Sequence, residues 1–431
     1  AQSCSRTGYT FAGFSQSGCG GTFNSSTGVC SSVTADMIIT ASWTLNTYQV
    51  TVNPSSGSCN PGTHTVNHGD ASSAQTCSRS GYSFVAFTQS GCGGIFNTST
   101  GVCSSVTSAM TITATWSNIA PTFSLAPEES IASSATSPTS IGSLIAFKAT
   151  ATDANANYYL IICSTNSVTA GSGGAAPTCG ATTYCTSSAT TSGSQASCSY
   201  TTLSGDAWSN AWYGFVCDNH STDTKCSAAN QGSGNSGSPF YVNHSPTFTD
   251  INITDSSQNP TESIQWNATA SDPDGNTVKL LVCKTNAISS GTCTGGNWCT
   301  SSLSASNPSC SYTIPTPTSD GLYDAWVFVV DQFNLEASGT KQGSESDFTV
   351  NNVAPVVSSV TLNNGNAILL NENTTTQIQL SATVTDVNGC GSEITSVLGY
   401  VYRSGITYTG CDTLAEANQN YCYPEVNCTE N

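Results

Sequence analysis

The sequence predicts an all-β protein made of small modules in tandem, stabilised by disulfide bonds. Three observations predict it: a segment that occurs twice near the start of the chain, runs in which Val, Ile and Thr alternate with polar residues, and 21 cysteines among 431 residues. Duplication at a fixed spacing is typical of modular arrays, and period-two alternation is typical of strands with one buried face.

The duplicated segment is residues 1–44, which returns as residues 74–117 with 31 of 44 positions identical. In the second case a strand pattern, Tyr-Gln-Val-Thr-Val-Asn, precedes the duplicated part. We therefore expect a partial repeat unit at 1–44 and a complete unit at 45–117. Arrays of this kind supply length or multivalency more often than catalysis.

Three tetrads of the form Asn-X-Ala/Ser-Pro mark the later boundaries. They begin at Asn118, Asn243 and Asn352, and each follows an alternating run that has the length of a strand. Proline cannot donate to a strand ladder, so each tetrad fits a linker between modules. The predicted modules are residues 118–242, 243–351 and 352–431.

These modules share an order of strand patterns. An alternating strand ends at Asp153, Asp272 and Asp386, and an apolar strand follows each; a late aromatic strand then ends at Asp218 and Asp331 in the first two modules. Ordered strands joined by Gly, Ser and Pro turns predict antiparallel β-sandwiches. In the third module no late aromatic strand follows, so we expect an incomplete sandwich. Either the chain belongs to a longer array, or a neighbouring copy adds a strand to an open edge and forms a head-to-tail filament.

Composition excludes several partners and indicates a compartment. Eight Lys and Arg against 26 Asp and Glu give a net charge of -18, which disfavours nucleic acid and anionic lipid. The apolar runs have strand length, so we expect no membrane insertion in this segment. So many cysteines, with four His and no Cys-X-X-Cys pair, indicate disulfides rather than metal or haem sites. Disulfides place the protein outside the cell or at its surface; the interior of a hyperthermophile is the alternative.

Cysteine parity singles out Cys4. The segments 1–117, 118–242, 243–351 and 352–431 hold 7, 6, 4 and 4 cysteines. If equivalent cysteines of the two repeat units pair alike, Cys4 is unpaired or has a partner elsewhere. In that scheme the disulfides are Cys19 with Cys30, Cys59 with Cys77 and Cys92 with Cys103. Further cysteines expected in disulfides, with their pairing left open, are Cys217, Cys226, Cys283, Cys293, Cys299 and Cys310.

Two loops carry oxygen-bearing side chains at alternate positions, which is how many calcium sites begin. The predicted ligands of Ca²⁺ are Asp153, Asn155, Asn157, Asp272, Asp274 and Asn276. Asp218 and Asp331 would contribute if their loops lie beside these. The alternative is an ordinary turn, in which Asp, Asn and Gly serve backbone geometry, and the Glu of an EF-hand loop is missing.

Other motifs give weaker indications of a functional site. His64 and His68 are four apart, but in a β unit that spacing does not bring them together as it would on a helix. The Gly-rich loop 232–237 lacks the pattern of a nucleophile elbow or a phosphate loop. With no nucleophile, acid–base pair or cofactor fingerprint, we expect no enzyme. Candidate glycosylation sequons begin at Asn24, Asn97, Asn219, Asn252 and Asn373, and glycosylation would require them to lie in exposed loops. Ser and Thr are so abundant that chance would produce a similar number of sequons.

The repeat resembles a known family through Arg79-Ser-Gly-Tyr-Ser-Phe84, Phe87 and the closing run from Met110 to Trp116. It is similar to the Listeria–Bacteroides repeat, the B-repeat of internalin-type surface proteins, although cysteines are not part of that pattern. The resemblance implies a β-grasp-like module that serves as a stalk or adhesive spacer. Residues 118–431 resemble Ig-like or cadherin-like modules of prokaryotic surface proteins, most clearly at residues 268–276.

These observations predict an extracellular structural protein, a surface stalk or filament subunit without catalysis. Its partners would be copies of itself or neighbouring modules of a longer chain. The alternative is an adhesin that binds a glycan or a surface protein through loops of the sandwiches. A stalk that carries an enzyme elsewhere in a longer polypeptide is a third possibility.

Overall fold

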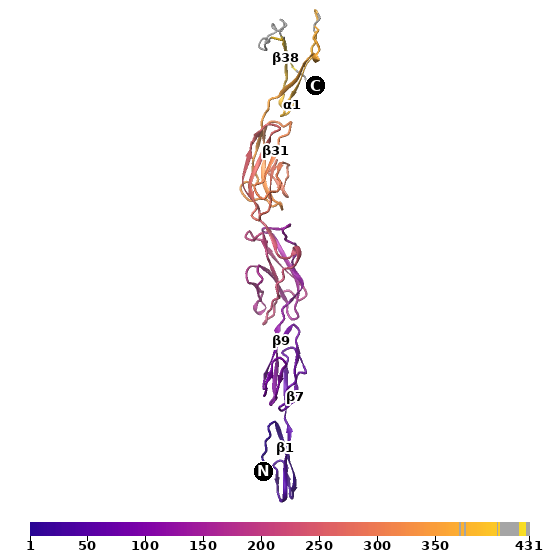
Figure 1. The fold of residues 1–431 in the computed structure, drawn as a ribbon, viewed down its shortest axis with the longest axis vertical. Helices are drawn as coiled ribbons and strands as arrows, with labels where there is room; N and C mark the ends of the chain where they lie inside the picture. The colour runs from indigo at the N-terminus through magenta and orange to yellow at the C-terminus, as the bar shows by residue number, and fades with distance from the viewer. Residues whose placement is uncertain (370–371, 375, 403, 406–421, 428–431) are drawn as a thin grey trace. The chain divides into compact units, whose positions relative to one another are not determined.

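The structure, a computed structural model, is built almost entirely of β-strands, which confirms the predicted fold class. The chain divides into two compact units, Ala1–Val242 and Asn243–Asn431. Figure 1 colours the chain by residue number, with the first unit running from indigo through magenta. The structure describes all residues except 370–371, 375, 403, 406–421 and 428–431.

The repeat unit at 45–117 is a mixed four-stranded sheet of order β7-β5-β12-β9. Its first and last strands, β5 and β12, are parallel neighbours, and the other pairs are antiparallel. This is the β-grasp-like arrangement that the resemblance implies, here without a helix. The strands are β5 (Thr47–Asn53), β7 (His64–Asn67), β9 (Tyr82–Ser90) and β12 (Met110–Asn118). Side chains from alternate positions form its core: Val50, Val52, Phe87, Val106, Met110, Ile112 and Ala114.

The repeat unit at 1–44 contains the counterparts of only part of that sheet. β1 (Tyr9–Cys19) and β4 (Val33–Leu45) form an antiparallel pair and correspond to β9 and β12. In the described part of the chain, no strand pairs with the other edge of β4. Each unit also has a small hairpin whose strands are two residues long. It is formed by β2 (Phe23–Asn24) with β3 (Val29–Cys30) in the first unit and by β10 (Phe96–Asn97) with β11 (Val102–Cys103) in the second.

The module at 118–242 is a β-sandwich. One sheet has the order β13-β15-β20 and the other the order β19-β16-β22, and a third small sheet has the order β14-β23-β21. Its core contains Phe147, Leu160, Trp212 and Phe240, all fully buried. The strands are β13 (Thr122–Glu129), β14 (Thr139–Ser140), β15 (Leu144–Thr152), β16 (Tyr158–Cys163), β19 (Thr183–Thr186), β20 (Gln195–Thr201), β21 (Ser209–Asn210), β22 (Tyr213–Asp218) and β23 (Phe240–Asn243).

The second unit begins with a sandwich of the same strand order. Its sheets are β24-β26-β31, β30-β27-β33-β34 and β25-β35-β32. Trp266, Val329 and Phe348 lie in its core. The strands are β24 (Thr247–Thr254), β25 (Ser257–Gln258), β26 (Ser263–Ser271), β27 (Val278–Cys283), β30 (Asn297–Thr300), β31 (Ser309–Thr313), β32 (Gly321–Tyr323), β33 (Trp326–Asp331), β34 (Ser344–Glu345) and β35 (Phe348–Val350).

The remaining elements are short. After residue 351 the described residues form two strand pairs, β36-β37 and β38-β39. Because 406–421 and 428–431 lie outside the described residues, the incomplete third sandwich stays a prediction. The bounds are β36 (Val356–Leu362), β37 (Leu380–Thr385), α1 (Cys390–Glu393), β38 (Leu398–Tyr402), β39 (Cys422–Asn427), and the minor strands β6 (Ser58–Asn60), β8 (Thr76–Ser78), β17 (Val168–Thr169), β18 (Thr178–Cys179), β28 (Ile288–Ser289) and β29 (Thr292–Cys293).

Disulfides close short loops throughout the described modules. Each loop closed restrains the unfolded chain, and small modules need this because they bury little apolar area. Cys217 and Cys226 have no cysteine counterparts in the second sandwich, where Val330 and Glu336 form the same β-bridge. The bonds are Cys19–Cys30, Cys59–Cys77, Cys92–Cys103, Cys163–Cys179, Cys185–Cys198, Cys217–Cys226, Cys283–Cys293 and Cys299–Cys310. Among the described residues, Cys4 and Cys390 are exposed and free.

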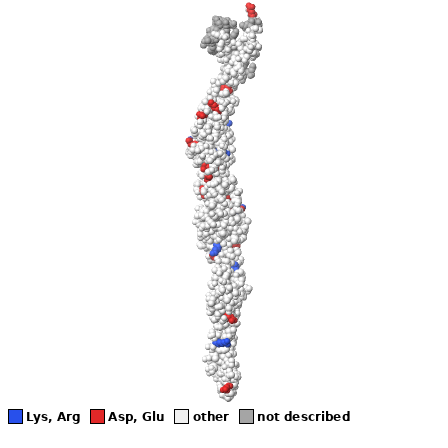
Figure 2. Space-filling view, in the orientation of Figure 1, with Lys and Arg blue, Asp and Glu red and all other residues white. Residues whose placement is uncertain are grey.

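Charged side chains are sparse on the surface. In Figure 2 most of the visible face is white, with scattered red and few blue atoms. Within the described ranges, no helix is both long and apolar enough to cross a membrane.

Candidate functional site: loops at the module junctions

The loop after β15 and the end of β22 meet in the first sandwich. Tyr158, which opens β16, lies opposite Asp218 at the end of β22, so the loop that begins at Asp153 lies beside Asp218. Burial raises the pKa of Asp218, and the nearby Asp153 carboxylate raises it further. The two sequence-predicted aspartates therefore belong to one acidic group.

Asn118 connects the repeat unit to this group. It is the last residue of β12 and is 4% exposed. Its Nδ2 donates hydrogen bonds to Oδ2 of Asp218 at 2.8 Å and to the carbonyl of Asp223 at 2.9 Å. Asn155 Nδ2 in turn donates to Asn118 Oδ1 at 2.8 Å and to the Gly81 carbonyl at 3.0 Å. These bonds fix the repeat unit 45–117 on the sandwich that follows it.

Asp223 and His220 reinforce the same junction. The Asp223 carboxylate accepts the backbone N–H of Asn118 at 2.7 Å and forms an ion pair with Lys225 at 3.0 Å. The Asn118 hydrogen bond, aided by Lys225, holds the pKa of Asp223 below its ordinary value, so this carboxylate stays ionised. The Tyr82 hydroxyl lies 2.6 Å from His220 Nε2. The sequence pattern did not single out His220 or Asp223, because neither belongs to a repeated motif.

The second sandwich contains an equivalent network. Asn243 Nδ2 donates to Asp331 Oδ2 at 2.6 Å, and Asn276 Nδ2 donates to Asn243 Oδ1 at 3.1 Å. Oδ2 of Asp274 accepts the backbone N–H of His244 at 2.6 Å, and Oδ1 of Asp274 lies 2.8 Å from Nδ1 of the His244 ring. The opening Asn of the tetrad is thus again bonded to the aspartate that ends the late strand.

A third version lies after residue 351 within the second unit. Asn388, 2% exposed, accepts the backbone N–H of Val353 at 2.8 Å through Oδ1. Its Nδ2 donates to the carbonyls of Asn351 and Thr318 at 3.0 and 3.1 Å. Here the loop asparagine after the alternating strand, rather than the tetrad asparagine, makes the connection.

The calcium hypothesis is partly compatible with this geometry. Oδ2 of Asp153 and Oδ2 of Asp272 are buried and have no hydrogen-bond partner in the described structure. Burial raises the pKa of Asp272 to about 6, and the Asp274 and Asp331 carboxylates add to the shift. A divalent cation would relieve both conditions, because it supplies the charge that a buried carboxylate lacks.

The asparagines among the predicted calcium ligands are not free to bind a cation together. Asn155 and Asn276 donate to the junction bonds, and Asn157 is exposed. Across the described ranges, no group of three or more His, Cys, Asp or Glu side chains is arranged to hold a metal ion. The oxygens left for a cation are Oδ2 of Asp153 and Oδ2 of Asp272, since both carboxylate oxygens of Asp218 and of Asp331 already accept hydrogen bonds. Calcium binding stays a prediction.

The two histidines of the repeat unit, His64 and His68, make separate contacts. His64 receives the backbone N–H of Ser73 at Nε2, at 3.1 Å, and its Nδ1 lies 2.7 Å from the Gly62 carbonyl. The His68 ring packs beside Tyr48, with 5.8 Å between ring centroids. Both rings therefore serve the fold of the repeat unit.

Of the predicted sequon asparagines, Asn219 is half-buried and the exposed ones are Asn24, Asn97, Asn252 and Asn373.

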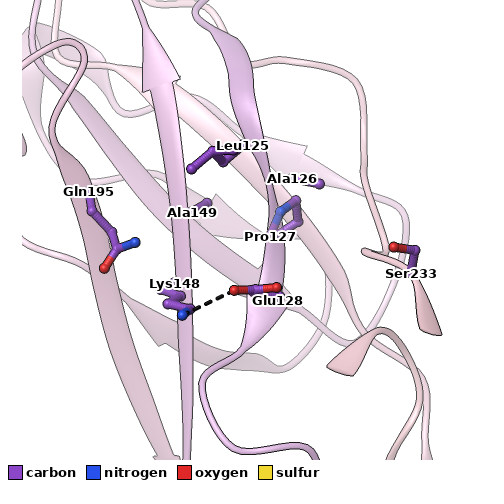
Figure 3. Close-up of a pocket in the computed structure, with 8 residues that line it drawn as sticks. All are labelled: Leu125, Ala126, Pro127, Glu128, Lys148, Ala149, Gln195 and Ser233. Atoms are coloured by element: carbon purple, nitrogen blue, oxygen red, sulfur yellow. Dashed lines mark ion pairs between the residues drawn. The ribbon is translucent and has the colours of Figure 1, made fainter. Parts of the chain in front are cut away.

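A small pocket lies on the first sandwich beside β13 and β15. Lys148 and Glu128 are among the residues that line it, and Figure 3 shows their ion pair, which is 3.0 Å long. Its volume is about 150 Å³. Ligand pockets are commonly about 300 Å³ or larger, and this lining offers no His or Cys for acid–base or nucleophilic chemistry.

One buried acid in this sandwich was not anticipated. Glu129 is 2% exposed; its Oε2 accepts the backbone N–H of Ser133 at 2.6 Å and its Oε1 accepts Trp212 Nε1–H at 3.1 Å. Burial raises its pKa to about 7. A fully buried tryptophan needs an acceptor for its N–H, but sequence alone did not indicate which residue would supply it.

Comparisons with known proteins give structural likeness only. No family model and no curated protein matches the chain. Among solved structures, the chicken CNTN1 FN1–FN3 domains are 10% identical, with a TM-score of 0.26, over 66% of this chain and 95% of that one. The Yersinia pseudotuberculosis adhesin InvE is 11% identical, with a TM-score of 0.18, over 50% and 57%.

The N-terminal eight Ig domains of Down Syndrome Cell Adhesion Molecule are 9% identical, with a TM-score of 0.20, over 86% of this chain and 55% of that one. At such identities and scores, the assignment of sandwich modules rests on the strand order of this chain itself. Its disulfides are those of an extracellular or secreted protein.

Proposed function

We propose that this chain is an extracellular structural protein, a segment of a surface stalk or a filament subunit, without catalytic activity of its own. The observation that carries the proposal is the hydrogen-bond network of Asn118. It joins the last strand of one module to loops of the next through buried, charge-assisted bonds, which hold geometry better than exposed ones. A protein that transmits force or keeps a distance needs such stiff junctions.

Two further features support a mechanical role. β12 ends at Asn118 and β13 begins at Thr122, so only a short linker separates the two sheets. Disulfides then limit how far each module extends when pulled, since the closed loops span 9 to 18 residues of sequence separation. The pocket beside Lys148 and Glu128, in contrast, has a volume of about 150 Å³, which is smaller than the roughly 300 Å³ at which ligand sites commonly begin.

Electron microscopy of the purified chain, combined with a glycan array, tests the proposal. Filaments, or stiff single particles that bind no glycan, are the expected result. Monomers that bind one glycan class with micromolar affinity through sandwich loops would establish the adhesin alternative instead. The control is a denatured sample of the same chain applied to the same array, because that sample keeps the composition of the chain but not the geometry of its loops.

A further inference from the structure

The two sandwiches have an edge strand with the same sequence. The pentapeptide Ser-Cys-Ser-Tyr-Thr occupies residues 197–201 in β20 and residues 309–313 in β31. Each strand pairs on one side only, β20 with β15 and β31 with β26. Among the described residues, no strand pairs with the other side of either one. Both edges belong to the sandwiches and lie well inside the sequence.

The unpaired side of β20 presents free backbone groups. In an antiparallel pair, residues that bond to the partner alternate with residues whose N–H and C=O groups point away from it. Thr202, directly after β20, donates its N–H to the Ser143 carbonyl at 3.0 Å, so every second residue before it also faces β15. The backbone groups of Ser197, Ser199 and Thr201 therefore point outward.

The same alternation holds in β31. Ile314, directly after the strand, donates its N–H to the Glu262 carbonyl at 2.9 Å. The residues of β31 whose backbone groups point outward are therefore Ser309, Ser311 and Thr313. In both strands the side chains of these outward residues are exposed as well.

The opposite edges of the same two sheets are protected against pairing, whereas β20 and β31 are not. Natural edge strands avoid pairing through charges, prolines or bulges. β13 contains Pro127, Glu128 and Glu129, and its register with β15 is interrupted; β24 contains Asp250 and also has an interrupted register. β20 and β31 keep a continuous register with their partners and contain no proline and no charged residue. These two edges are therefore able to accept a further strand.

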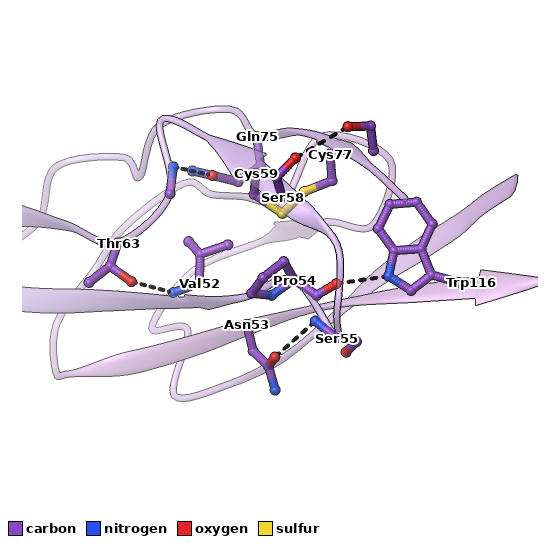
Figure 4. The surroundings of a disulfide bond; sticks show 12 residues. Val52, Asn53, Pro54, Ser55, Ser58, Cys59, Thr63, Gln75, Cys77 and Trp116 are labelled. Atoms are coloured by element: carbon purple, nitrogen blue, oxygen red, sulfur yellow. Dashed lines mark hydrogen bonds between the residues drawn. A yellow bond between two sulfur atoms is a disulfide. The ribbon is translucent and has the colours of Figure 1, made fainter. Parts of the chain in front are cut away.

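A disulfide holds each of these edge strands in place. Cys198 in β20 is bonded to Cys185 in β19, which belongs to the other sheet, and β31 has the equivalent bond. The repeat unit differs, because Figure 4 shows the bond between Cys59 and Cys77, two residues that already pair across β6 and β8. A strand that is held extended in this way loses little conformational freedom when it pairs.

We propose that β20 and β31 form an interface between two copies of this chain, in which each edge strand pairs antiparallel with a Ser-Cys-Ser-Tyr-Thr strand of the second copy. Ser199 lies opposite Ser199 of the second copy in this pairing, and Ser197 lies opposite Thr201. Because the two edges have one sequence, β20 pairs equally well with β20 or β31 of the second copy. This goes beyond the proposed function, since a stalk that stands alone or an adhesin would present the same edges.

A second copy suits these edges for two physical reasons. In this register the serine and threonine hydroxyls meet across the two strands, and such pairs form cross-strand hydrogen bonds. Neither strand bears a charge, so the net charge of -18 is carried elsewhere on the chain and opposes association only through a field that salt screens.

Sedimentation and hydrogen exchange of the purified chain test the proposal. The exposed thiols of Cys4 and Cys390 are alkylated first, so that thiol cross-links do not contribute. We expect a dimer to form as the chain is concentrated from about 10 μM to about 1 mM, with the amides of the outward residues in β20 and β31 exchanging about fivefold more slowly at the higher concentration. The amides of β13 should exchange at the same rate at both concentrations.

Proline at the centre of each edge removes the outward donor. It leaves the ladder of the sandwich intact, because proline is tolerated where the N–H of an edge strand faces solvent. The double variant S199P/S311P should therefore stay monomeric, whereas S199A/S311A, which keeps both N–H groups, should still associate. Unchanged exchange of the β15 amides shows that the first sandwich of the proline variant is folded.

Charged variants test the register independently of proline. The chain S199K/S311K should not associate with itself, and neither should S199E/S311E, because like charges then lie directly opposite each other. A mixture of the lysine and glutamate chains should associate again, since opposite charges meet.

Three results would overturn the proposal. The first is an unmodified chain that remains monomeric up to about 1 mM with unchanged amide exchange in β20 and β31. The second is association that S199P/S311P leaves as strong as before, which would place the interface elsewhere. The third is a mixture of the lysine and glutamate chains that stays monomeric while the unmodified chain forms dimers, which would exclude pairing centred on Ser199 and Ser311.

Discussion

The side chain of Asn118 donates a 2.8 Å hydrogen bond to Oδ2 of Asp218, one hundred residues further along the chain. The second sandwich repeats the bond between Asn243 and Asp331 at 2.6 Å. Both acceptors are fully buried. Each module therefore attaches its first residue to the end of its own late strand, which makes the entrance of the chain into the module a stiff element.

Asn118→Ala should destabilise the first sandwich by about 1–3 kcal/mol, because it leaves a buried carboxylate one donor short. Chemical denaturation monitored by hydrogen exchange in 118–242 measures the loss. The matched control is Asn166→Ala, which removes an exposed asparagine from a loop of the same sandwich and should change stability by less than about 0.5 kcal/mol. Equal effects of the two substitutions would contradict the role of the junction.

Glu129 should make the first sandwich less stable as pH rises from about 4.5 to 7. Its pKa is raised from 4.5 to about 7 in the folded protein, so the folded state holds a proton that the unfolded state has lost in this window. The contribution of Glu129 to stability is greatest below pH 4.5, and about 3 kcal/mol of it is lost above pH 7. Thermal unfolding monitored in 118–242 at pH 5 and 7.5 measures it.

Glu129→Gln should flatten this pH dependence while lowering stability at pH 5, because the amide serves only one of the two donors as an acceptor. Glu128→Gln is the control, since Glu128 is an exposed neighbour in an ion pair with Lys148. If Glu128→Gln flattens the curve as much, burial of Glu129 is not its cause.

Calcium should stabilise the second sandwich if Asp272 belongs to a cation site. At millimolar Ca²⁺ and a Kd in the range of extracellular modules, we expect about 1 kcal/mol of stabilisation at pH 7. Differential scanning calorimetry with Ca²⁺, Mg²⁺ or chelator measures it. Asp272→Asn should abolish the response and Asp250→Asn, at an exposed carboxylate, should keep it. An unchanged transition at 10 mM Ca²⁺ would exclude the site.

Reduction of the disulfides should lengthen each module when it is unfolded by force. Opening Cys59–Cys77 releases the residues between them, with a sequence separation of 18, which adds about 60 Å at roughly 3.4 Å per residue. Single-molecule stretching before and after a reductant measures the change in contour length. The double variant Cys59→Ser with Cys77→Ser should show the added length without reductant, whereas Cys4→Ser should not.

Sequence reasoning failed at specific places for a physical reason. Asp218 and Asp331 were found because they end repeated strand patterns, but their partners Asn118 and Asn243 were interpreted only as linker residues. Glu129 was missed altogether, since its acceptor role depends on Trp212, 83 residues away. Hydrogen bonds between distant residues leave no local period in the sequence.

The sequence by itself determined the all-β class and the repeat architecture, because alternation and duplication are local properties that any reader of the chain can count. It also singled out Cys4 by parity. Only the tertiary structure decided which side chains meet, and it exposed one face of β4 while burying the same residues on β12. The equivalent strands differ there because burial depends on the neighbour that packs on a strand, and that neighbour lies elsewhere in the chain.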